Sequence, residues 1–274
     1  MIQIPNDRDR KRGESMFEYI QFEMERDVAI LTLNNPKKLN AINFQMMDEM
    51  HQALDLLETN GARALVIWGG EKVFGAGMDI TRDKSAEKVK PTDNVVARKL
   101  HTLYNRIESL PIAVIAAVSG YALGGGFELS LACDIRIFSE TAKVGLPELN
   151  LGTIPCGGGT QRLPRLVGSG KALELILTCD KITAEEAYRL GIANRVVPVE
   201  ELWNEAMTLA HRLAAQAPLA VEMAKHAVYA GLETDLTTGL FIEARDSAPL
   251  KYTEDYAEGV AAFREKRKPQ FRGA

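Results

Sequence analysis

The chain has 274 residues, of which 46% are hydrophobic and 26% charged, and 33 Lys and Arg against 37 Asp and Glu give a formal net charge of -4. This length allows one or two domains with a large core, and the composition excludes an intrinsically disordered protein. Because no apolar run approaches the roughly 18 residues of a membrane span and no overall positive charge attracts a phosphate backbone, we expect neither a membrane nor a nucleic-acid partner.

The N-terminal part of the sequence predicts an extension followed by a hairpin. Residues 1–15 mix basic and acidic side chains without an apolar segment, so we expect a solvated extension, and Met16 could serve as an alternative start. Phe17–Glu23 and Val28–Leu33 have the composition of strands and are separated by a short polar turn. Two antiparallel strands are therefore expected here.

The middle of the chain alternates helical and strand patterns. Apolar residues recur at helical spacing after Asn43, and again before the apolar run Ile112–Val118, while Ala64–Trp68 is another short apolar run. The helical positions are Met47, Met50, Leu54 and Leu57 in the first segment, and Leu100, Leu103, Tyr104 and Ile107 in the second. Alternation of this kind predicts an α/β fold with a largely parallel, buried sheet.

The last third of the sequence is rich in helix signals. Thr183–Glu186 has the pattern of a capping box, with Gly191 placed to end its helix, and Pro218–Ala230 is expected to end at Gly231. Thr253 is a good N-cap for a last helix that runs toward Lys266. We therefore expect an extension at 1–15, an α/β core at 16–198 and a helical region at 199–274.

Cysteines and histidines give no sign of disulfides or metals. Cys133, Cys156 and Cys179 are odd in number and form no C-x-x-C pair, which favours packing roles in a reducing compartment. The four histidines show none of the spacings of metal ligands, so no metal is expected. Together with the missing secretory signal, this pattern predicts a cytoplasmic protein.

The segment Ile112–Asp134 encodes a strand, a glycine turn and the start of a helix. Free backbone N–H groups at a helix N-terminus can stabilise an oxygen that acquires negative charge, and Gly125 N–H is the natural donor. The alternative is that the glycines only allow helix and sheet to pack closely. Their spacing matches neither the dinucleotide motif G-x-G-x-x-G nor the phosphate-binding loop G-x-x-x-x-G-K-[ST].

Two glutamates are candidates for acid–base catalysis. Glu128 lies among apolar residues in the helix that follows the glycines, and Glu148 lies in a loop bounded by glycine and proline. Two carboxylates at one cavity can move protons in opposite directions if their pKa values differ. Taken singly, each could instead be an exposed acid, one in a first helical turn and one on a surface loop. The loop Val73–Ile80 offers Ala76 N–H as a second backbone donor.

Several segments resemble the enoyl-CoA hydratase, or crotonase, family over about residues 17–272. They are Asn35–Ala41, Phe74–Asp79, Gly120–Glu128, Leu146–Glu148, Leu151–Leu163 and Glu265–Pro269. The resemblance implies a crotonase-like spiral of ββα units with a helical C-terminal trimerisation region, in a homotrimer or a dimer of trimers.

The resemblance also implies roles for individual residues. The thioester oxygen of the substrate is expected between the amides of Ala76 and Gly125, with Glu128 and Glu148 as the catalytic acids. Coenzyme A is implied as part of the substrate, with no separate cofactor. The residues expected to bind the substrate are Lys37, Lys38, Leu39, Ala76, Met78, Asp79, Ile80, Gly124, Gly125, Phe263 and Lys266. Of these, Lys266 is expected to reach the nucleotide from an adjacent subunit, or else to be only a solvated helix end.

Because both glutamates are present, the resemblance favours a hydratase that adds water across the 2,3 double bond of a 2-enoyl-CoA. The alternatives are a double-bond isomerase, which can work with one carboxylate, and a catalytically silent CoA-binding protein. Asp246–Leu250 is more polar than is common in the family, and Phe127 is larger. Both could reshape the acyl pocket, so the sequence assigns no acyl chain length, branching or ring.

Overall fold

The computed structural model describes residues 16–81 and 94–274, so the predicted extension at 1–15 lies outside the described residues. The larger of its two sheets has the order β1-β2-β3-β5-β7-β10, in which β1 and β2 are antiparallel and the other neighbours are parallel. Its strands are β1 (Ile20–Glu25), β2 (Val28–Leu33), β3 (Ala64–Trp68), β5 (Ala113–Val118), β7 (Ile135–Ser139) and β10 (Arg195–Val197). Every residue of β5 is buried, as expected for a strand covered on both faces.

A second, smaller sheet has the order β4-β6-β8-β9, with β9 antiparallel to β8 and the other pairs parallel. Its strands are β4 (Val73–Gly75), β6 (Tyr121–Leu123), β8 (Lys143–Gly145) and β9 (Ile182–Thr183). Within residues 16–81 and 94–274, the chain passes from the large sheet to the small one three times, from β3 to β4, from β5 to β6 and from β7 to β8. Each passage is followed by a helix, which confirms the expected ββα spiral.

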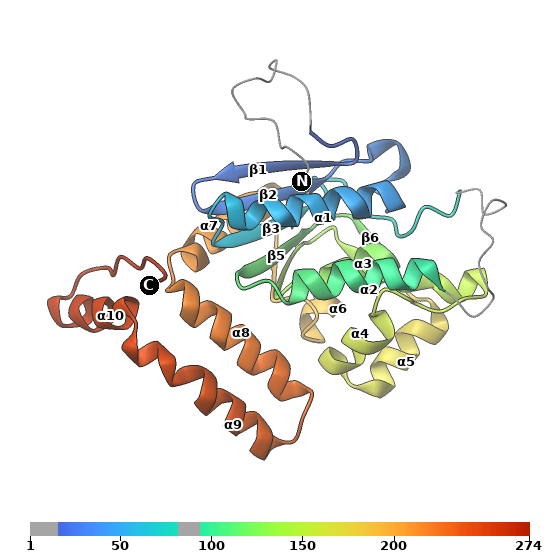
Figure 1. Cartoon of the computed structure of the whole chain (residues 1–274). Helices are drawn as coiled ribbons and strands as arrows, with labels where there is room; N and C mark the ends of the chain where they lie inside the picture. The colour runs from blue at the N-terminus through green and yellow to red at the C-terminus, as the bar shows by residue number, and fades with distance from the viewer. Residues whose placement is uncertain (1–15, 82–93) are drawn as a thin grey trace.

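The core helices are α1 (Phe44–Thr59), α2 (Val95–Glu108), α3 (Gly125–Leu131), α4 (Gly159–Val167), α5 (Ser169–Thr178) and α6 (Ala184–Arg189). Among them, α1 and α2 lie side by side, and α4 and α5 pack against each other (Figure 1). The 3-10 turns η2 (Pro36–Lys38) and η3 (Pro147–Leu151) also belong to the core. One large apolar cluster joins β1 and β2 to helices α1 to α3, and it includes Met47, Met50, Leu103 and Tyr104 as the helical pattern predicts.

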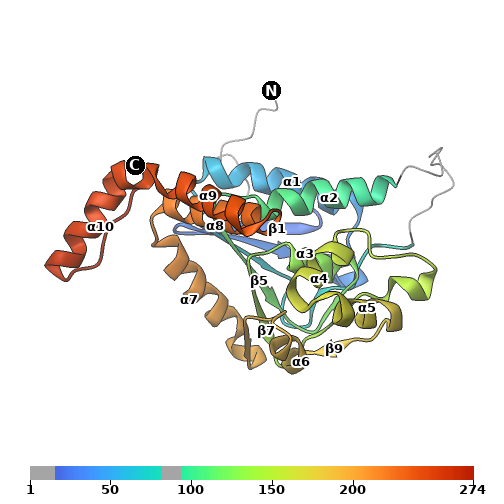
Figure 2. The ribbon, with the colours of Figure 1, turned by 90° about the horizontal axis from the view of Figure 1, so that it is seen from below.

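The C-terminal helices have two different positions. Helix α7 (Leu202–Ala214) packs on the large sheet and forms a second apolar cluster with it. Helices α8 (Pro218–Leu232), α9 (Leu236–Ser247) and α10 (Glu254–Glu265) project from one side of the core in Figure 1, and Figure 2 shows α10 extending farthest from it. The turns η4 (Val199–Glu201) and η5 (Pro249–Tyr252) precede α7 and α10. In the described ranges, no helix combines the length and the apolar character that crossing a bilayer requires.

Several predicted element boundaries are confirmed, and others differ by one to three residues. The side chains of Thr183 and Thr253 cap α6 and α10 as expected. Strand β1 begins at Ile20 rather than Phe17, because the Glu49 carboxylate binds the amides just before it. Helix α8 continues through Gly231 to Leu232, so this glycine does not end the helix.

Candidate active site

Glu128 lies in the first turn of α3 with only 1% of its surface exposed. Its Oε1 accepts hydrogen bonds from Gly157 N at 2.7 Å and from Gly159 N at 2.8 Å. Burial raises the pKa of this carboxyl, while the two amides and the charge of Arg162 act in the opposite direction. The alternative of an exposed first-turn acid is therefore wrong, and Glu128 is a buried carboxyl held by backbone amides.

The glycines before Glu128 also have a packing role. A Cβ atom on Gly126 would overlap the carbonyl oxygen of Gly75 in β4, so only glycine lets α3 lie this close to the small sheet. Gly124, which has φ 49° and ψ -126°, makes the sharp turn from β6 into α3. Gly124, Gly125 and Gly126 therefore allow close packing and also form the turn and the N-terminus of α3, so the two interpretations of these glycines do not exclude each other.

Glu148 lies in η3, directly after β8, and approaches Glu128 from the neighbouring turn of the spiral. A Cβ on Gly124 would come within 2.9 Å of Glu148 Oε1, which places this carboxyl against the start of α3. Its other oxygen, Oε2, is buried and has no hydrogen-bond partner among the described residues. Burial, and then the charge of Glu128, raise the pKa of Glu148 to about 7. The structure thus brings the two predicted acids together.

The Ala76 amide is not where the sequence analysis expects it. Ala76 N donates its hydrogen to Leu39 O at 3.0 Å, the carbonyl of the residue that directly follows η2. In this structure the Ala76 amide is therefore already engaged within the protein. Gly77, with φ 102°, turns the backbone directly after Ala76. The sequence marks this loop as one that approaches a ligand closely, but it does not reveal which amide the turn leaves available.

Met78 supplies an amide in the position expected for Ala76. The bridge between Ile42 and Met78 is made by the Gly77 carbonyl, 2.7 Å from Ile42 N, and by the Asp79 amide, 2.8 Å from Ile42 O. The Met78 amide takes no part in this bridge. Its nitrogen lies 3.7 Å from the position of a Cβ on Gly125, and Gly125 N is the first of α3, where no intrahelical acceptor exists. Two backbone donors therefore lie side by side near the acids.

Two further residues that the sequence analysis did not assign to the site support it. Tyr104 of α2 is fully buried and donates its hydroxyl hydrogen to Gly125 O at 2.7 Å. Arg162 of α4 pairs with Glu108 at 2.9 Å and also donates to Gly157 O at 3.3 Å. Tyr104 fixes the peptide of Gly125, whose amide is one of the two donors, and Arg162 fixes the peptide of Gly157, whose amide binds Glu128. In the sequence, Tyr104 is one of the apolar positions of a helix, and its hydroxyl group is the one signal that could have distinguished it from a core residue.

The lysines and the loop expected to bind coenzyme A form one exposed cluster. Lys38 Nζ lies 2.6 Å from Asp79 Oδ2 and 2.9 Å from the Thr81 hydroxyl. The hydrogen bonds that Lys38 and Thr81 donate to the Asp79 carboxylate lower the pKa of Asp79 to about 2. Lys37, Leu39 and Ile80 are exposed next to them. The bridge between Ile42 and Met78 joins this cluster to the Met78 amide.

Phe263 and Lys266 lie at the end of α10, on the part of the chain that projects from the core (Figure 2). Within one chain they are therefore remote from α3 and its carboxyl, and an approach from an adjacent subunit stays a prediction. Asp246, in α9, contacts His226 at 2.5 Å and Arg245 at 2.8 Å. Phe127 is buried in the main apolar cluster. The effect of these two departures on an acyl pocket also stays a prediction.

The chain is similar to known enzymes over nearly its whole length. The family model described as enoyl-CoA hydratase/isomerase matches residues 23–274. The chain is 42% identical to the short-chain-enoyl-CoA hydratase of Clostridium acetobutylicum over 252 residues, which cover 90% of this chain and 94% of that protein. It is also 42% identical to the crotonyl-CoA hydratase of Syntrophomonas wolfei, covering 93% and 98% of the two proteins. A crystal structure of enoyl-CoA hydratase from Bacillus anthracis superposes with a TM-score of 0.89 at 39% identity, covering 94% of this chain and 100% of that one.

Proposed function

Because the chain belongs to the enoyl-CoA hydratase/isomerase family, we propose that it is a hydro-lyase that adds water across the 2,3 double bond of 2-enoyl-CoA thioesters. The observation that carries this proposal is the convergence of Glu128 and Glu148 beside two backbone amides. The similarity to a short-chain-enoyl-CoA hydratase and to a crotonyl-CoA hydratase supports the same reaction.

We assign the backbone donors to Met78 and Gly125 rather than to Ala76 and Gly125. When hydroxide adds to C3, negative charge develops on the thioester oxygen, and two amides fixed before the reaction stabilise it without reorganising. Loss of one such donor typically costs about 2.7 to 4 kcal/mol of barrier. Tyr104 helps to fix this geometry, because it holds the carbonyl oxygen of Gly125.

The two acids differ in a way that suggests distinct roles. Glu148, with a pKa of about 7, holds a proton in a large fraction of molecules at neutral pH and can donate it to C2. Glu128 has its Oε1 fixed by two amides, which favour the carboxylate, and can accept a proton from water through Oε2. Water then gives hydroxide to C3 and a proton to Glu128, and the pair regains its starting protonation by exchange with solvent.

The competing functions are disfavoured by the same geometry. An isomerase shuttles one proton and needs one carboxylate, whereas this site has two that are electrostatically coupled. A silent CoA-binding protein has no need for a buried carboxylate oxygen without a hydrogen-bond partner, which is costly for folding. Hydration by two acids accounts for both features.

Coenzyme A is proposed as the handle of the substrate, with no separate cofactor. The cluster of Lys37, Lys38 and Asp79 lies next to Met78, so a thioester with its oxygen at the Met78 amide would extend its phosphates toward the lysines. Opposite charges attract, and Lys38 could exchange its contact with Asp79 for one with a phosphate. We also propose the cytoplasm as the location, on the basis of the cysteine pattern.

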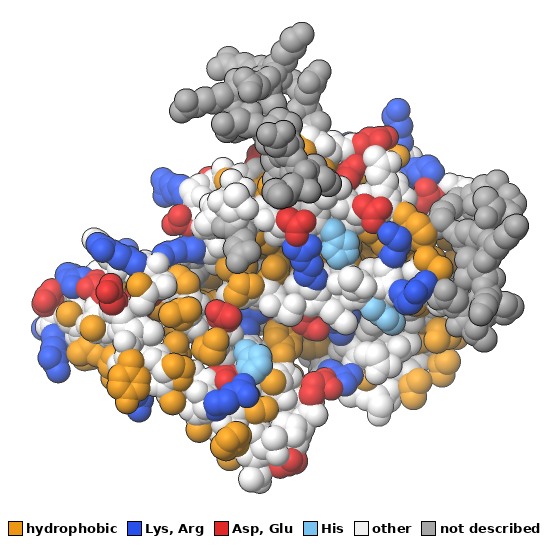
Figure 3. Space-filling model, viewed as in Figure 1, with side chains coloured by type: hydrophobic (Ala, Val, Ile, Leu, Met, Phe, Trp, Pro, Cys, Tyr) orange, Lys and Arg blue, Asp and Glu red, His pale blue; other side chains and the backbone are white. Residues whose placement is uncertain are grey.

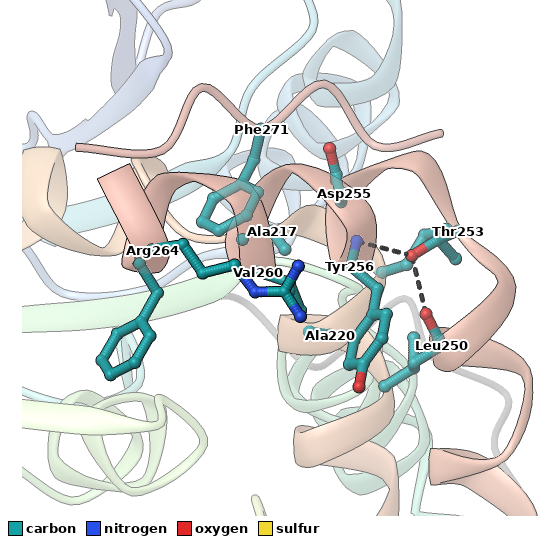
Figure 4. A pocket seen from close by; sticks show the side chains of 12 residues that line it. Ala217, Ala220, Leu250, Thr253, Asp255, Tyr256, Val260, Arg264 and Phe271 are labelled. Atoms are coloured by element: carbon teal, nitrogen blue, oxygen red, sulfur yellow. Dashed lines mark hydrogen bonds between the residues drawn. The ribbon is translucent and has the colours of Figure 1, made fainter. Parts of the chain in front are cut away.

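We propose a homotrimer or a dimer of trimers, assembled through the projecting helices. Large apolar side chains are exposed on this part, and Figure 3 shows them gathered over α8, α9 and α10. They include Leu236 at 78%, Phe263 at 86% and Tyr252 at 91% exposure. Patches of this kind mark interaction surfaces, and the groove of about 410 Å³ beside α10 in Figure 4, between Tyr256 and Phe271, is continuous with them. Phe241 in α9 is also exposed, at 70%, and sedimentation of wild type and Phe241→Asp tests the proposal, because the variant should dissociate.

The function is tested with a panel of short, long, branched and cyclic 2-enoyl-CoA esters, together with a 3-enoyl-CoA. A hydratase consumes the conjugated double bond and forms the 3-hydroxyacyl product. Migration of the 3-enoyl double bond without any hydration would instead establish the isomerase, and binding of CoA without either reaction would establish the silent protein.

A further inference from the structure

Arg162, near the start of α4, has a largely enclosed side chain that is 12% exposed. Its Nε and Nη2 atoms donate to the two carboxylate oxygens of Glu108 at 2.9 and 3.0 Å. Nη2 also donates to Asn105 Oδ1 at 2.7 Å, and Nη1 donates to Gly157 O at 3.3 Å. A two-pronged ion pair with further hydrogen bonds fixes the plane of a guanidinium, so Arg162 is held in one orientation.

A single residue, Gly157, joins this guanidinium to the Glu128 carboxylate. Its carbonyl oxygen accepts from Arg162, and its N–H donates to Glu128 Oε1 at 2.7 Å. Gly158 follows, between the two amides that bind Glu128, and a Cβ there would overlap Arg162 Nη1. The guanidinium therefore lies directly against the turn at 157–159, which carries both hydrogen-bond donors of Glu128.

Helix α2 holds Arg162 in this place. Asn105 and Glu108 are three residues apart on α2, so they lie on one face of the helix, and both bind the guanidinium. Tyr104, the residue before Asn105, donates to the carbonyl oxygen of Gly125. One turn of α2 therefore positions the peptide of a backbone donor and, through Arg162, the turn that binds Glu128.

The positive charge of Arg162 opposes the cost of burying Glu128. A buried carboxylate needs hydrogen bonds or an opposite charge in place of the water that it has lost. Glu128 is 1% exposed, and burial raises its pKa, while the two amides and then the charge of Arg162 act in the opposite direction. In the proposed mechanism Glu128 accepts a proton from water, which only the ionised carboxyl can do.

On the basis of the proposed function, we propose that Arg162 is a positioning residue for hydration, which holds the turn at 157–159 against Glu128 and supplies the positive charge that favours its carboxylate. Glu108 offsets part of that charge. The two members of the ion pair therefore act on the proton affinity of Glu128 in opposite directions. A purely structural link between α2 and α4 would have no such signature, because loss of either member would weaken the same contact.

Other titratable groups also face this ion pair and Glu128. The neighbours of Glu128 are Glu148 in η3, Cys156 in the loop before α4 and Tyr104 on α2. Glu108 also lines a cavity of about 360 Å³ between α2 and the α8–α9 hairpin, whose charged or titratable residues are Glu222, Lys225, His226, Tyr229, Arg245 and Asp246. All of these groups are kept in the variants below, so a difference between variants belongs to Arg162 and Glu108.

The experiment compares the full wild-type chain with Arg162→Gln, Arg162→Lys and Glu108→Gln in two readouts. The first is the pH profile of kcat and KM for the hydration of 2-butenoyl-CoA. The second is an infrared pH titration of the Glu128 carboxyl, identified as the band that Glu128→Gln removes. This titration reports on Glu128 whether or not the protein hydrates a thioester.

Loss of the positive charge should move the ionisation of Glu128 to higher pH. In Arg162→Gln, the acid limb of kcat and the infrared midpoint should rise by about 0.5 to 1 pH units. Its kcat at the optimum should fall at least about tenfold, and its KM should change less than about threefold. Arg162→Lys keeps the charge but not the fork, so its midpoint should stay within about 0.3 pH units of wild type while its kcat falls. In Glu108→Gln the midpoint should stay or fall, and it should not rise.

Arg165→Gln is the matched control, because Arg165 lies on the same helix and pairs with Glu233 at 3.2 Å but is half exposed. It should behave as wild type. An unchanged midpoint in Arg162→Gln, or an equal rise in Glu108→Gln, overturns the proposal and leaves the hydratase intact. If Arg162→Gln does not fold, a raised midpoint in Arg162→Lys or in Glu108→Gln overturns it.

The proposed function can fail separately. Wild type that hydrates no 2-enoyl thioester refutes the hydratase, and the infrared titration still decides the role of Arg162. A midpoint of Glu128 that rises in Arg162→Gln and not in Arg165→Gln then supports Arg162 as the residue that sets the charge of this carboxyl. A midpoint that is the same in both variants overturns it.

Discussion

Replacement of Glu148 by glutamine should stabilise the folded protein at alkaline pH. The pKa of this carboxyl is raised from 4.5 to about 7 in the folded state, so folding favours its protonated form. Its contribution to stability is complete below pH 4.5 and is lost as the pH rises through about 7. Glutamine does not titrate, so the variant escapes this loss.

The size of the effect follows from the shift and from the burial of the side chain. At about 1.4 kcal/mol per tenfold change in proton affinity, a rise in pKa from 4.5 to about 7 corresponds to about 3.4 kcal/mol for a wholly shielded group. Because Glu148 is only half-buried, solvent screens part of this, and we expect about 1 to 2 kcal/mol.

The measurement is denaturant unfolding of wild type and Glu148→Gln at several pH values. The variant minus wild-type difference in the free energy of unfolding should grow by about 1 to 2 kcal/mol between about pH 5 and pH 8. Glu200→Gln, at an exposed glutamate in η4, controls for the general loss of a negative charge. A difference that is constant across this range, or that falls with rising pH, would refute the reasoning.

Two other substitutions test how the site is held in place. Gly126→Ala puts a Cβ on the Gly75 carbonyl oxygen, so it should lower the free energy of unfolding by at least about 1 to 3 kcal/mol and lower the activity as well. The control is Gly170→Ala, in open space on α5, which should be neutral or stabilise the protein by up to about 1 kcal/mol. Equal unfolding midpoints for the two variants would argue against the close contact at Gly126. Tyr104→Phe removes the bond to Gly125 O and should cost about 0.5 to 1.5 kcal/mol and lower kcat more than it changes KM; an unchanged kcat would exclude a positioning role.

Four strands of the large sheet and several helices could be predicted because their apolar patterns are long enough to show a period, whereas strands β7 and β10 of the same sheet were not predicted. Val28–Leu33 and Ala64–Trp68 are strands with the predicted boundaries. The small sheet could not be predicted from the residues in this way, because strands of two or three residues, such as Val73–Gly75, show no period. Its place in a ββα unit was implied only by the resemblance.

The site was predictable where chemistry is carried by an unusual side chain, and less so where it is carried by backbone. Glu128 is conspicuous among apolar neighbours. The available amide is that of Met78 and not of Ala76, because the outcome depends on the left-handed turn at Gly77.

The central claim is that Glu128 and Glu148 act together on one substrate. The most direct measurement is the hydration of 2-butenoyl-CoA by wild type, Glu128→Gln and Glu148→Gln in deuterated water, followed by loss of the conjugated absorbance and by product mass. Wild type should place one solvent deuteron on C2, and each variant should lose about 10² to 10⁴ in kcat while remaining folded. A folded variant that hydrates the thioester at the wild-type rate would contradict the account.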